Sequence, residues 1–266
     1  MIRDITLGQY YPTDSVLHRL DPRVKLFGTL IYVIPLFLFQ SFTGYIVATV
    51  FLVSMIALSH VPVKFIFRGL RAVLFILVFT AVLNAFLTPG RTLVSFWKIT
   101  ITIEGVRLAA FMILRLVYLI IGSSLMTLTT TPSNLTDGLE KSLGWLKVFR
   151  FPVHEIAMMM SIALTFIPVL LEETDRIIKA QQARGADFES GSIIRRAKSL
   201  VPILVPLFVS AFRRANDLAI AMESRCYHGG EGRTKMRPLK YMLRDYVAYT
   251  VLILYLAAVI VIGILF

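Results

Sequence analysis

The stretch VHEIAMMMSIALTFIPVLLEETDRIIKAQQARG, residues 153–185, begins apolar and ends charged. Its apolar residues recur at helical spacing, which predicts one long helix over residues 152–184. Residues 192–225 repeat this order, apolar first and charged second, and predict a second long helix. At 1.5 Å per residue each helix is about 45 Å long. Each is therefore expected to run from a layer beneath a membrane to a distant aqueous surface.

The composition is that of an integral membrane protein. Hydrophobic residues make up 57% of the 266 residues and charged residues 17%, against roughly 45–50% and about 25% in soluble domains. Five apolar runs approach the roughly 20 residues that a helix needs to cross a bilayer. The sequence thus predicts an all-α membrane protein with about five transmembrane helices, at Leu26–Phe39, Thr43–Ser59, Leu70–Leu87, Val106–Thr129 and Tyr246–Phe266.

The distribution of charge decides where the two long helices lie. Their apolar parts, Ile156–Leu171 and Val201–Phe212, are shorter than a span. If both crossed the membrane, one end of the basic connector between them would lie outside the cell, against the positive-inside rule. With five spans we expect the N-terminus inside, the C-terminus outside, and residues 130–245, with 17 of the 28 Lys and Arg, in the cytoplasm. The net charge of +12 then belongs to loops near anionic lipid and not to nucleic-acid binding.

A short amphipathic helix is predicted at TTPSNLTDGLEKSLGWLKVF, residues 130–149. Thr131 or Ser133 can cap its start, and we expect it along the membrane surface or under neighbouring helices, with Trp145 at the interface. The domains are a membrane domain with four spans at 1–130, a cytoplasmic domain of three helices at 131–243, and a last span at 244–266. The apolar stripe of the short helix comprises Leu135, Leu139, Leu143 and Leu146.

The two long helices end alike, because KAQQARG at 179–185 aligns with IAMESRC at 220–226. Small residues on both sides let another protein approach closely and leave the guanidinium free to bind carboxylates and main-chain carbonyls. The alternative is that each arginine only complements the negative end of its helix dipole. Two matched ends in one chain favour docking into two matched sites. The residues of these ends are Ala183, Arg184, Gly185, Ser224, Arg225 and Cys226.

Through these ends, and through SVLHRLDPRVKL at 15–26 and TTTPSNLTDGLEKSL at 129–143, the chain resembles the T component of energy-coupling factor (ECF) transporters. This family supplies the transmembrane scaffold of ABC-type vitamin and metal importers. The resemblance implies that the two long helices are coupling helices, whose arginine ends insert into grooves of two ABC-type ATPase subunits. The second end departs from the Ala-Arg-Gly form of the family, so its helix is expected to end at Gly229 and Gly230 instead.

The resemblance also implies a function. The chain would couple ATP hydrolysis by the two ATPases to movement of a small membrane-embedded S component that captures a vitamin or another micronutrient. It would be no enzyme and hold no cofactor, since ATP and magnesium would be bound by the ATPases, and it would lie in a prokaryotic cell membrane. One or more S components are expected on the apolar faces of the cytoplasmic helices, at Leu135, Leu139, Leu143, Met158, Met159, Met160 and Pro168.

Two groups of charged residues near and inside the spans need an explanation, the segment that begins at Asp21 and the single residue Arg115. Asp21, Pro22, Arg23 and Lys25 fit a turn followed by a basic membrane anchor, or a family role that ties the N-terminus to the coupling helices. Arg115 lies well inside a predicted span. A structural role is favoured for it, because the spans hold no acidic group for ion coupling.

Other functions fit the sequence less well. The chain has no G-x-x-x-x-G-K-[ST] phosphate loop, and its one cysteine and four histidines lack the spacing of metal ligands. A self-sufficient secondary transporter would need an ion-coupling site and an internal repeat of spans, and neither is evident. A conventional ABC permease also docks ATPases, but it would normally use one short coupling helix and line the substrate path itself.

Overall fold

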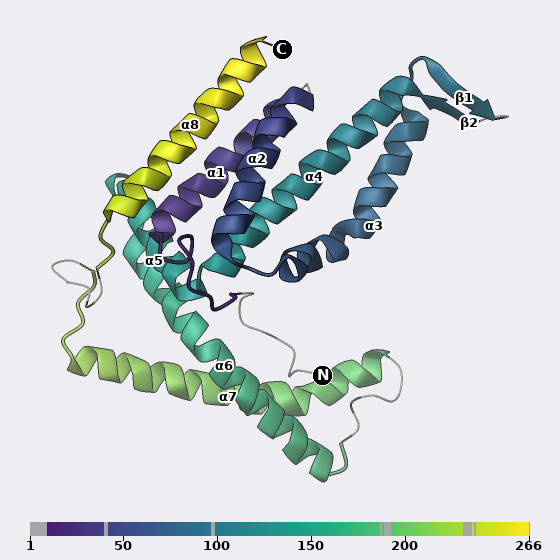
Figure 1. Ribbon diagram of the computed structural model, residues 1–266. Helices are drawn as coiled ribbons and strands as arrows, with labels where there is room; N and C mark the ends of the chain where they lie inside the picture. Colours follow the sequence, from purple (N-terminus) through teal and green to yellow (C-terminus); the bar gives the residue numbers. More distant parts are fainter. Residues whose placement is uncertain are drawn as a thin grey trace. The chain divides into compact units, whose positions relative to one another are not determined.

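In a computed structural model the chain forms helices joined mostly by short connections (Figure 1). The structure describes residues 10–39, 42–96, 99–186, 188, 193–230, 236 and 238–265. These residues divide into two compact units. The membrane unit contains the described residues up to Lys141 and those from Leu239 onward, and the α6–α7 unit contains those from Ser142 to Pro238.

The membrane unit packs four long helices side by side, α1, α2, α4 and α8, with α3 paired to α4 (Figure 1). Its core is apolar and aromatic, with Leu36, Ala48 and Ile66 fully buried and Tyr32 stacked on Phe51. The helices of this unit are α1 (Pro22–Leu38), α2 (Phe42–Ser59), α3 (Val63–Leu87), α4 (Ile103–Thr129), α5 (Pro132–Ser142) and α8 (Leu243–Leu265).

The all-α membrane fold is confirmed. Among the described residues, α2, α4, α8 and also α6 (Val153–Ala183) are long and apolar enough to cross a membrane. The two arms of α3, Val63–Arg71 and Val73–Leu87, make a fifth candidate if their bend of 58° lies within one span. The apolar part of α6 alone, Ile156–Leu171, is shorter than a span. Because the whole helix passes by length and composition, its location outside the bilayer stays a prediction.

The first helix is short for a span. It has 17 residues, which at 1.5 Å per residue is about 26 Å, less than a hydrocarbon layer of about 30 Å. It begins at Pro22 because the Asp21 side chain accepts a hydrogen bond from the Arg23 amide, and proline at the first helical position needs no donor partner. The helix therefore starts four residues before the apolar run that predicted it.

A short antiparallel hairpin joins α3 to α4 and was not predicted from the sequence. Its strands are β1 (Thr92–Phe96) and β2 (Ile99–Thr102), with Phe96 opposite Ile99. The second strand leads directly into α4, where the Thr102 hydroxyl accepts a hydrogen bond from the Gly105 amide and caps the helix. Four β-branched residues in succession, 99–102, are the signal that could have indicated this strand.

The amphipathic segment after α4 is broken into two elements. Thr131 caps α5, because its side chain accepts from the Asn134 amide, but the helix ends at Ser142 and the short 3-10 helix η1 (Gly144–Phe149) follows. Leu143 and Leu146 therefore lie outside α5. The single stripe of four leucines that the sequence analysis predicted is wrong for this reason.

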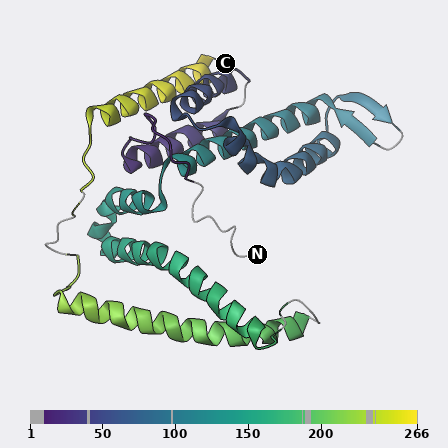
Figure 2. The ribbon, with the colours of Figure 1, turned by 60° about the horizontal axis from the view of Figure 1, so that its bottom comes forward.

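The α6–α7 unit is built on two long helices, α6 (Val153–Ala183) and α7 (Ile193–Ser224), which lie next to each other in opposite chain directions (Figure 2). Near one end the Gln181 side chain donates to the Pro202 carbonyl at 3.4 Å. Farther along, Arg214 of α7 forms an ion pair with Glu173 of α6 at 3.4 Å. A cavity of about 290 Å³ lies between the helices, lined mainly by apolar side chains and by Arg214.

Candidate functional site

The end of α6 is stopped by a Schellman motif. The amide of Ala186 donates to the Gln181 carbonyl at 3.0 Å, and the amide of Gly185 donates to the Gln182 carbonyl at 2.9 Å. Gly185 has a φ of +84°, the left-handed conformation that this motif requires directly after the helix cap. Arg184 is the cap residue itself, so its side chain projects from the last point of the helix.

The end of α7 repeats this geometry with other residues. The amide of Tyr227 donates to the Met222 carbonyl at 3.0 Å, and the amide of Cys226 donates to the Glu223 carbonyl at 2.8 Å. Cys226, with a φ of +56°, occupies the left-handed position that Gly185 occupies in α6. The expectation that this helix ends at Gly229 and Gly230 is wrong, because Cys226 adopts the left-handed conformation and α7 ends at Ser224.

Both arginines are presented to solvent. Arg184 and Arg225 are exposed, as are the small residues on both sides of each. Among the described residues neither guanidinium has an ion-pair partner, whereas Glu173 and Arg214, about three turns before these ends on the same helices, are paired with each other. An exposed guanidinium with unused donors at a rigid helix end is suited to enter a pocket that offers carboxylates or carbonyls.

The two arginine ends are far apart on one helix pair. Gln181, next to the first end, contacts Pro202 in the first third of α7, and Arg225 follows the last residue of α7. The 22 residues from Pro202 to Ser224 correspond to about 33 Å of helix. One small pocket cannot accept both ends, so the geometry requires two separate receiving sites.

The residues predicted to carry an S component are divided between the two units. Leu135 and Leu139 belong to the membrane unit, whereas Leu143 and the methionines belong to the α6–α7 unit. Met159 is 58% exposed and Met160 41%. Met158 is half-buried, and Pro168 is exposed within α6.

A larger apolar surface on α7 was missed by the sequence analysis. Its members recur with helical spacing on one side of the helix and are all exposed. The signal was present in the sequence as pairs of apolar residues every four positions, but none of these residues was among those predicted to carry an S component. The residues of this α7 stripe are Leu200, Val201, Leu204, Val205, Phe208, Val209 and Phe212.

The N-terminal motif, Asp21 to Lys25, joins two parts of the membrane unit that are far apart in the sequence, the start of α1 and the start of α8. The Asp21 carboxylate accepts two hydrogen bonds from the Arg23 side chain, at 2.9 and 3.0 Å. The Asp21 amide donates to Asp245 at 2.8 Å, and the other oxygen of Asp245 accepts from the Met242 amide at 2.8 Å. The Arg23 guanidinium also lies 3.8 Å from the centre of the Tyr241 ring. The motif therefore holds the start of α1 against the start of α8, in addition to capping α1.

The charge state of Asp21 follows from these contacts. Burial alone would raise the pKa of this carboxyl group, but the hydrogen bonds and the charge of Arg23 outweigh burial and hold the pKa below its ordinary value. Asp21 is therefore a carboxylate at neutral pH. Asp245, only 1% exposed, accepts backbone hydrogen bonds with both oxygens.

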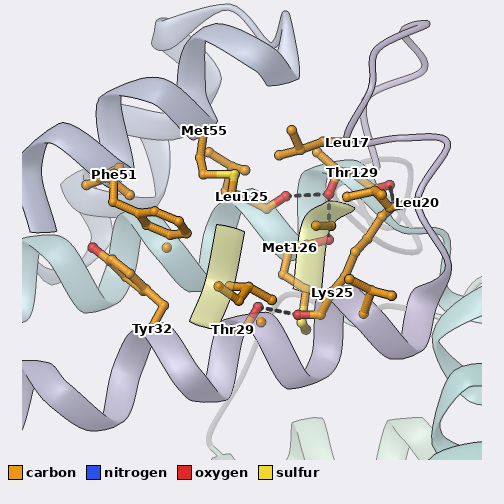
Figure 3. A pocket seen from close by; sticks show the side chains of 16 residues that line it. Leu17, Leu20, Lys25, Thr29, Tyr32, Phe51, Met55, Leu125, Met126 and Thr129 are labelled. Carbon is orange, nitrogen blue, oxygen red and sulfur yellow. Dashed lines mark hydrogen bonds between the residues drawn. The ribbon is translucent and has the colours of Figure 1, made fainter. Parts of the chain in front are cut away.

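Lys25 lies one turn farther along α1, at the rim of a cavity of about 90 Å³ between α1, α2, α4 and α8 (Figure 3). Its ammonium group donates to the Thr129 carbonyl at 2.7 Å and to the His18 carbonyl at 3.3 Å. Apolar side chains such as Leu125 and Met55 line the remainder of the cavity. Lys25 thus provides a donor for a carbonyl that the end of α4 leaves without a helical partner.

Arg115 does the same for the end of α1. Its guanidinium donates to the Leu36 carbonyl at 3.1 Å and to the Phe39 carbonyl at 3.5 Å. Along α1, between Lys25 and Leu36, the Tyr32 hydroxyl also donates to the Tyr118 carbonyl of α4 at 3.3 Å. Each of the helices α1 and α4 therefore supplies a cation for the carbonyl end of the other. Arg115 has the structural role that the absence of acidic residues in the spans favoured.

In the described part of the chain, no group of three or more His, Cys, Asp or Glu side chains is arranged to hold a metal ion. The features that do stand out are the two exposed arginine ends, the α7 stripe and the Asp21–Asp245 contact. The first two are directed outward and the third is internal.

Comparison with known proteins identifies the family of the chain. The chain matches the CbiQ family, described as cobalt transport protein, over residues 13–236. It is 56% identical over 250 residues to the energy-coupling factor transporter transmembrane protein EcfT of Clostridium kluyveri, covering 93% of each chain. The protein of the same name in Brevibacillus brevis is 49% identical over 264 residues, covering 99% of this chain and 98% of the relative. That of Lactococcus lactis is 44% identical over 245 residues, covering 92% of each. The chain therefore belongs to the CbiQ family, as a transmembrane component of energy-coupling factor transporters.

Proposed function

We propose that the chain is the scaffold that links two ABC-type ATPase subunits to a membrane-embedded, substrate-binding S component in the uptake of a vitamin or another micronutrient. The observation that carries this proposal is the pair of matched Schellman ends, each presenting an exposed arginine with unused donors. In this function the chain is a non-catalytic subunit, and ATP and magnesium are bound by the ATPases.

The geometry of the two ends supports one ATPase at each. They are separated by about 33 Å of helix, so they enter two different subunits. The residue after each arginine is held in the left-handed conformation, which turns the chain away sharply. This turn leaves the guanidinium as the leading group of the helix end, where it can donate several hydrogen bonds to one pocket.

The contact between α6 and α7 supports a mechanical role. The two helices meet along apolar side chains, one ion pair and a cavity of about 290 Å³. A partly open interface of this kind resists small displacements less than a close-packed one does. Movement of the ATPases on closure would shift α6 against α7, and the exposed α7 stripe would carry that shift to the S component.

The proposed orientation follows the positive-inside rule. The N-terminus and the α6–α7 unit lie in the cytoplasm, where the ATPases are, and the C-terminus lies outside a prokaryotic cell membrane. Labelling of intact cells with a membrane-impermeant thiol reagent tests this orientation. The single cysteine of the chain, Cys226, should not react if it lies in the cytoplasm.

The function is tested by purifying the tagged chain from its native membrane in mild detergent and identifying the accompanying proteins by mass spectrometry. We expect two ATPase subunits and at least one small hydrophobic protein. Repeated recovery of the chain alone, under conditions that keep other membrane complexes intact, would favour a self-sufficient transporter. In that case the two arginines would be reduced to helix caps.

A further inference from the structure

The segment KSLGWLKVFRFP, residues 141–152, carries large apolar side chains that are mostly exposed in the described chain. Val148 is 84% exposed, Phe149 73% and Trp145 62%. The Trp145 and Phe149 rings contact each other edge to face, with centroids 6.2 Å apart. Exposed aromatic and branched side chains grouped so closely indicate an apolar environment that is absent from the isolated chain.

The backbone holds these side chains in a defined arrangement. Residues 144–149 form the 3-10 helix η1, whose end is closed by Arg150 in the left-handed conformation, with a φ of +59°. The Arg150 amide donates to the carbonyls of Leu146 and Lys147. Phe151, 47% exposed, follows this turn directly. The apolar group therefore projects from a folded turn.

The charges of the segment have one sign. Lys141, Lys147 and Arg150 are all exposed, and no acidic residue occurs from 141 to 154. Aromatic side chains interleaved with cations are typical of segments that lie in the interface of a bilayer, with the rings among the headgroups and the cations near anionic lipid phosphates. An apolar protein partner would explain the aromatic residues but not the uniform positive charge.

The segment follows directly on α5, the helix that comes after the span candidate α4. Only Ser142 and Leu143 separate η1 from Lys141, the last residue of this part of the membrane unit. Two residues form a very short tether. An interfacial position for η1 therefore needs no long connection to the spans.

We propose that residues 143–151 form an interfacial anchor, which inserts Trp145, Val148, Phe149 and Phe151 into the headgroup boundary of a bilayer leaflet that contains anionic lipid. Lys141, Lys147 and Arg150 contact the lipid phosphates. The anchor fixes the start of the α6–α7 unit at the membrane surface. It rests on the membrane fold alone and does not depend on the proposed partners or substrate.

The chain offers a direct test, because it has only two tryptophans. Trp97→Phe, at a position outside the described residues, leaves Trp145 as the only indole. This variant is reconstituted alone in nanodiscs that contain anionic lipid, with or without lipid brominated in the upper part of the acyl chains. We expect Trp145 emission to lie at a short wavelength, to be quenched by the brominated lipid and to be weakly sensitive to acrylamide.

Charge reversal separates the anchor from a general apolar contact. Lys147→Glu combined with Arg150→Glu is expected to reduce quenching by brominated lipid, whereas Arg176→Glu, at an exposed arginine on α6, leaves it unchanged. Water-like emission of Trp145 that acrylamide quenches and brominated lipid does not would overturn the proposal. Equal quenching in wholly zwitterionic lipid, and in the charge-reversed variant, would overturn the assignment of an anionic surface.

Discussion

At the two Schellman ends, adding a side chain at the left-handed position should destabilise the helix end, and removing one should stabilise it. Gly185 and Cys226 both hold the left-handed position, with φ values of +84° and +56°. A residue with a side chain is less stable than glycine in this conformation by about 1–2 kcal/mol. A Cβ atom at Gly185 would meet nothing within 4 Å, so no steric term adds to the backbone cost. We expect Gly185→Ala to destabilise the end of α6, and Cys226→Gly to stabilise the end of α7, each by about 1 kcal/mol.

Native-state hydrogen exchange measures these effects locally. One kcal/mol corresponds to about a fivefold change in an equilibrium constant, so amides at the end of α6 should exchange about fivefold faster in Gly185→Ala. Amides at the end of α7 should exchange about fivefold more slowly in Cys226→Gly. Gly144→Ala is the matched control, because a Cβ there also meets nothing within 4 Å and no left-handed φ is involved. If Gly144→Ala and Gly185→Ala changed exchange equally, the argument from backbone conformation would be refuted.

Three further predictions concern the membrane unit. Arg115→Leu leaves the Leu36 carbonyl without its donor and should lower the free energy of unfolding of the unit by about 1–3 kcal/mol. Arg115→Lys keeps a cation and should lower it less. Thermal unfolding in detergent measures both changes. Asp245→Asn replaces one of two accepting oxygens by a donor and should cost a similar amount; an unchanged unfolding temperature would contradict the contact with the Asp21 amide. Because the folded-state pKa of Asp21 is lowered, its stabilisation through Arg23 is present above about pH 4 and is lost as the pH falls through the folded-state value. The stability difference between the wild type and Asp21→Asn should therefore shrink on acidification.

The helices could be predicted from the sequence because they carry strong patterns. Continuous apolar runs predicted α1, α2, α3, α4 and α8, and periodic apolar positions predicted α6 and α7. Their starts could not be predicted from the apolar runs, because charged residues interrupt the first turns, Arg23 and Lys25 in α1 and Lys64 and Arg68 in α3. The start of α1 at Pro22 was nevertheless readable in the motif that begins with Asp21.

Other elements were hidden by patterns that continued past them. Leu143 and Leu146 stay in phase with the leucines of α5, so the end of that helix at Ser142 could not be read from periodicity. The left-handed conformation of Cys226 was equally hidden, because cysteine rarely adopts it and two glycines follow at 229 and 230. Only the alignment of the two arginine ends could have suggested it.

Long-range contacts lay beyond sequence patterns altogether. Asp21 and Asp245 are 224 residues apart, and nothing in one sequence pairs two acidic residues through a backbone amide. Likewise, the presence of Arg115 inside a span was evident, but its acceptors, the carbonyls of Leu36 and Phe39, belong to another helix. A structure was needed to show that α1 and α4 supply a cation to each other.

The most direct test of the central claim is the number of ATPase subunits bound per chain, measured by native mass spectrometry without ATP on the complex recovered from the membrane. The proposal predicts two for the wild type, loss of one in Arg184→Glu or Arg225→Glu, and loss of both in the double variant. Arg176→Glu and Arg213→Glu, at exposed arginines within α6 and α7, should retain both. A double variant that still binds two ATPase subunits as firmly as the wild type would contradict docking through the two arginine ends.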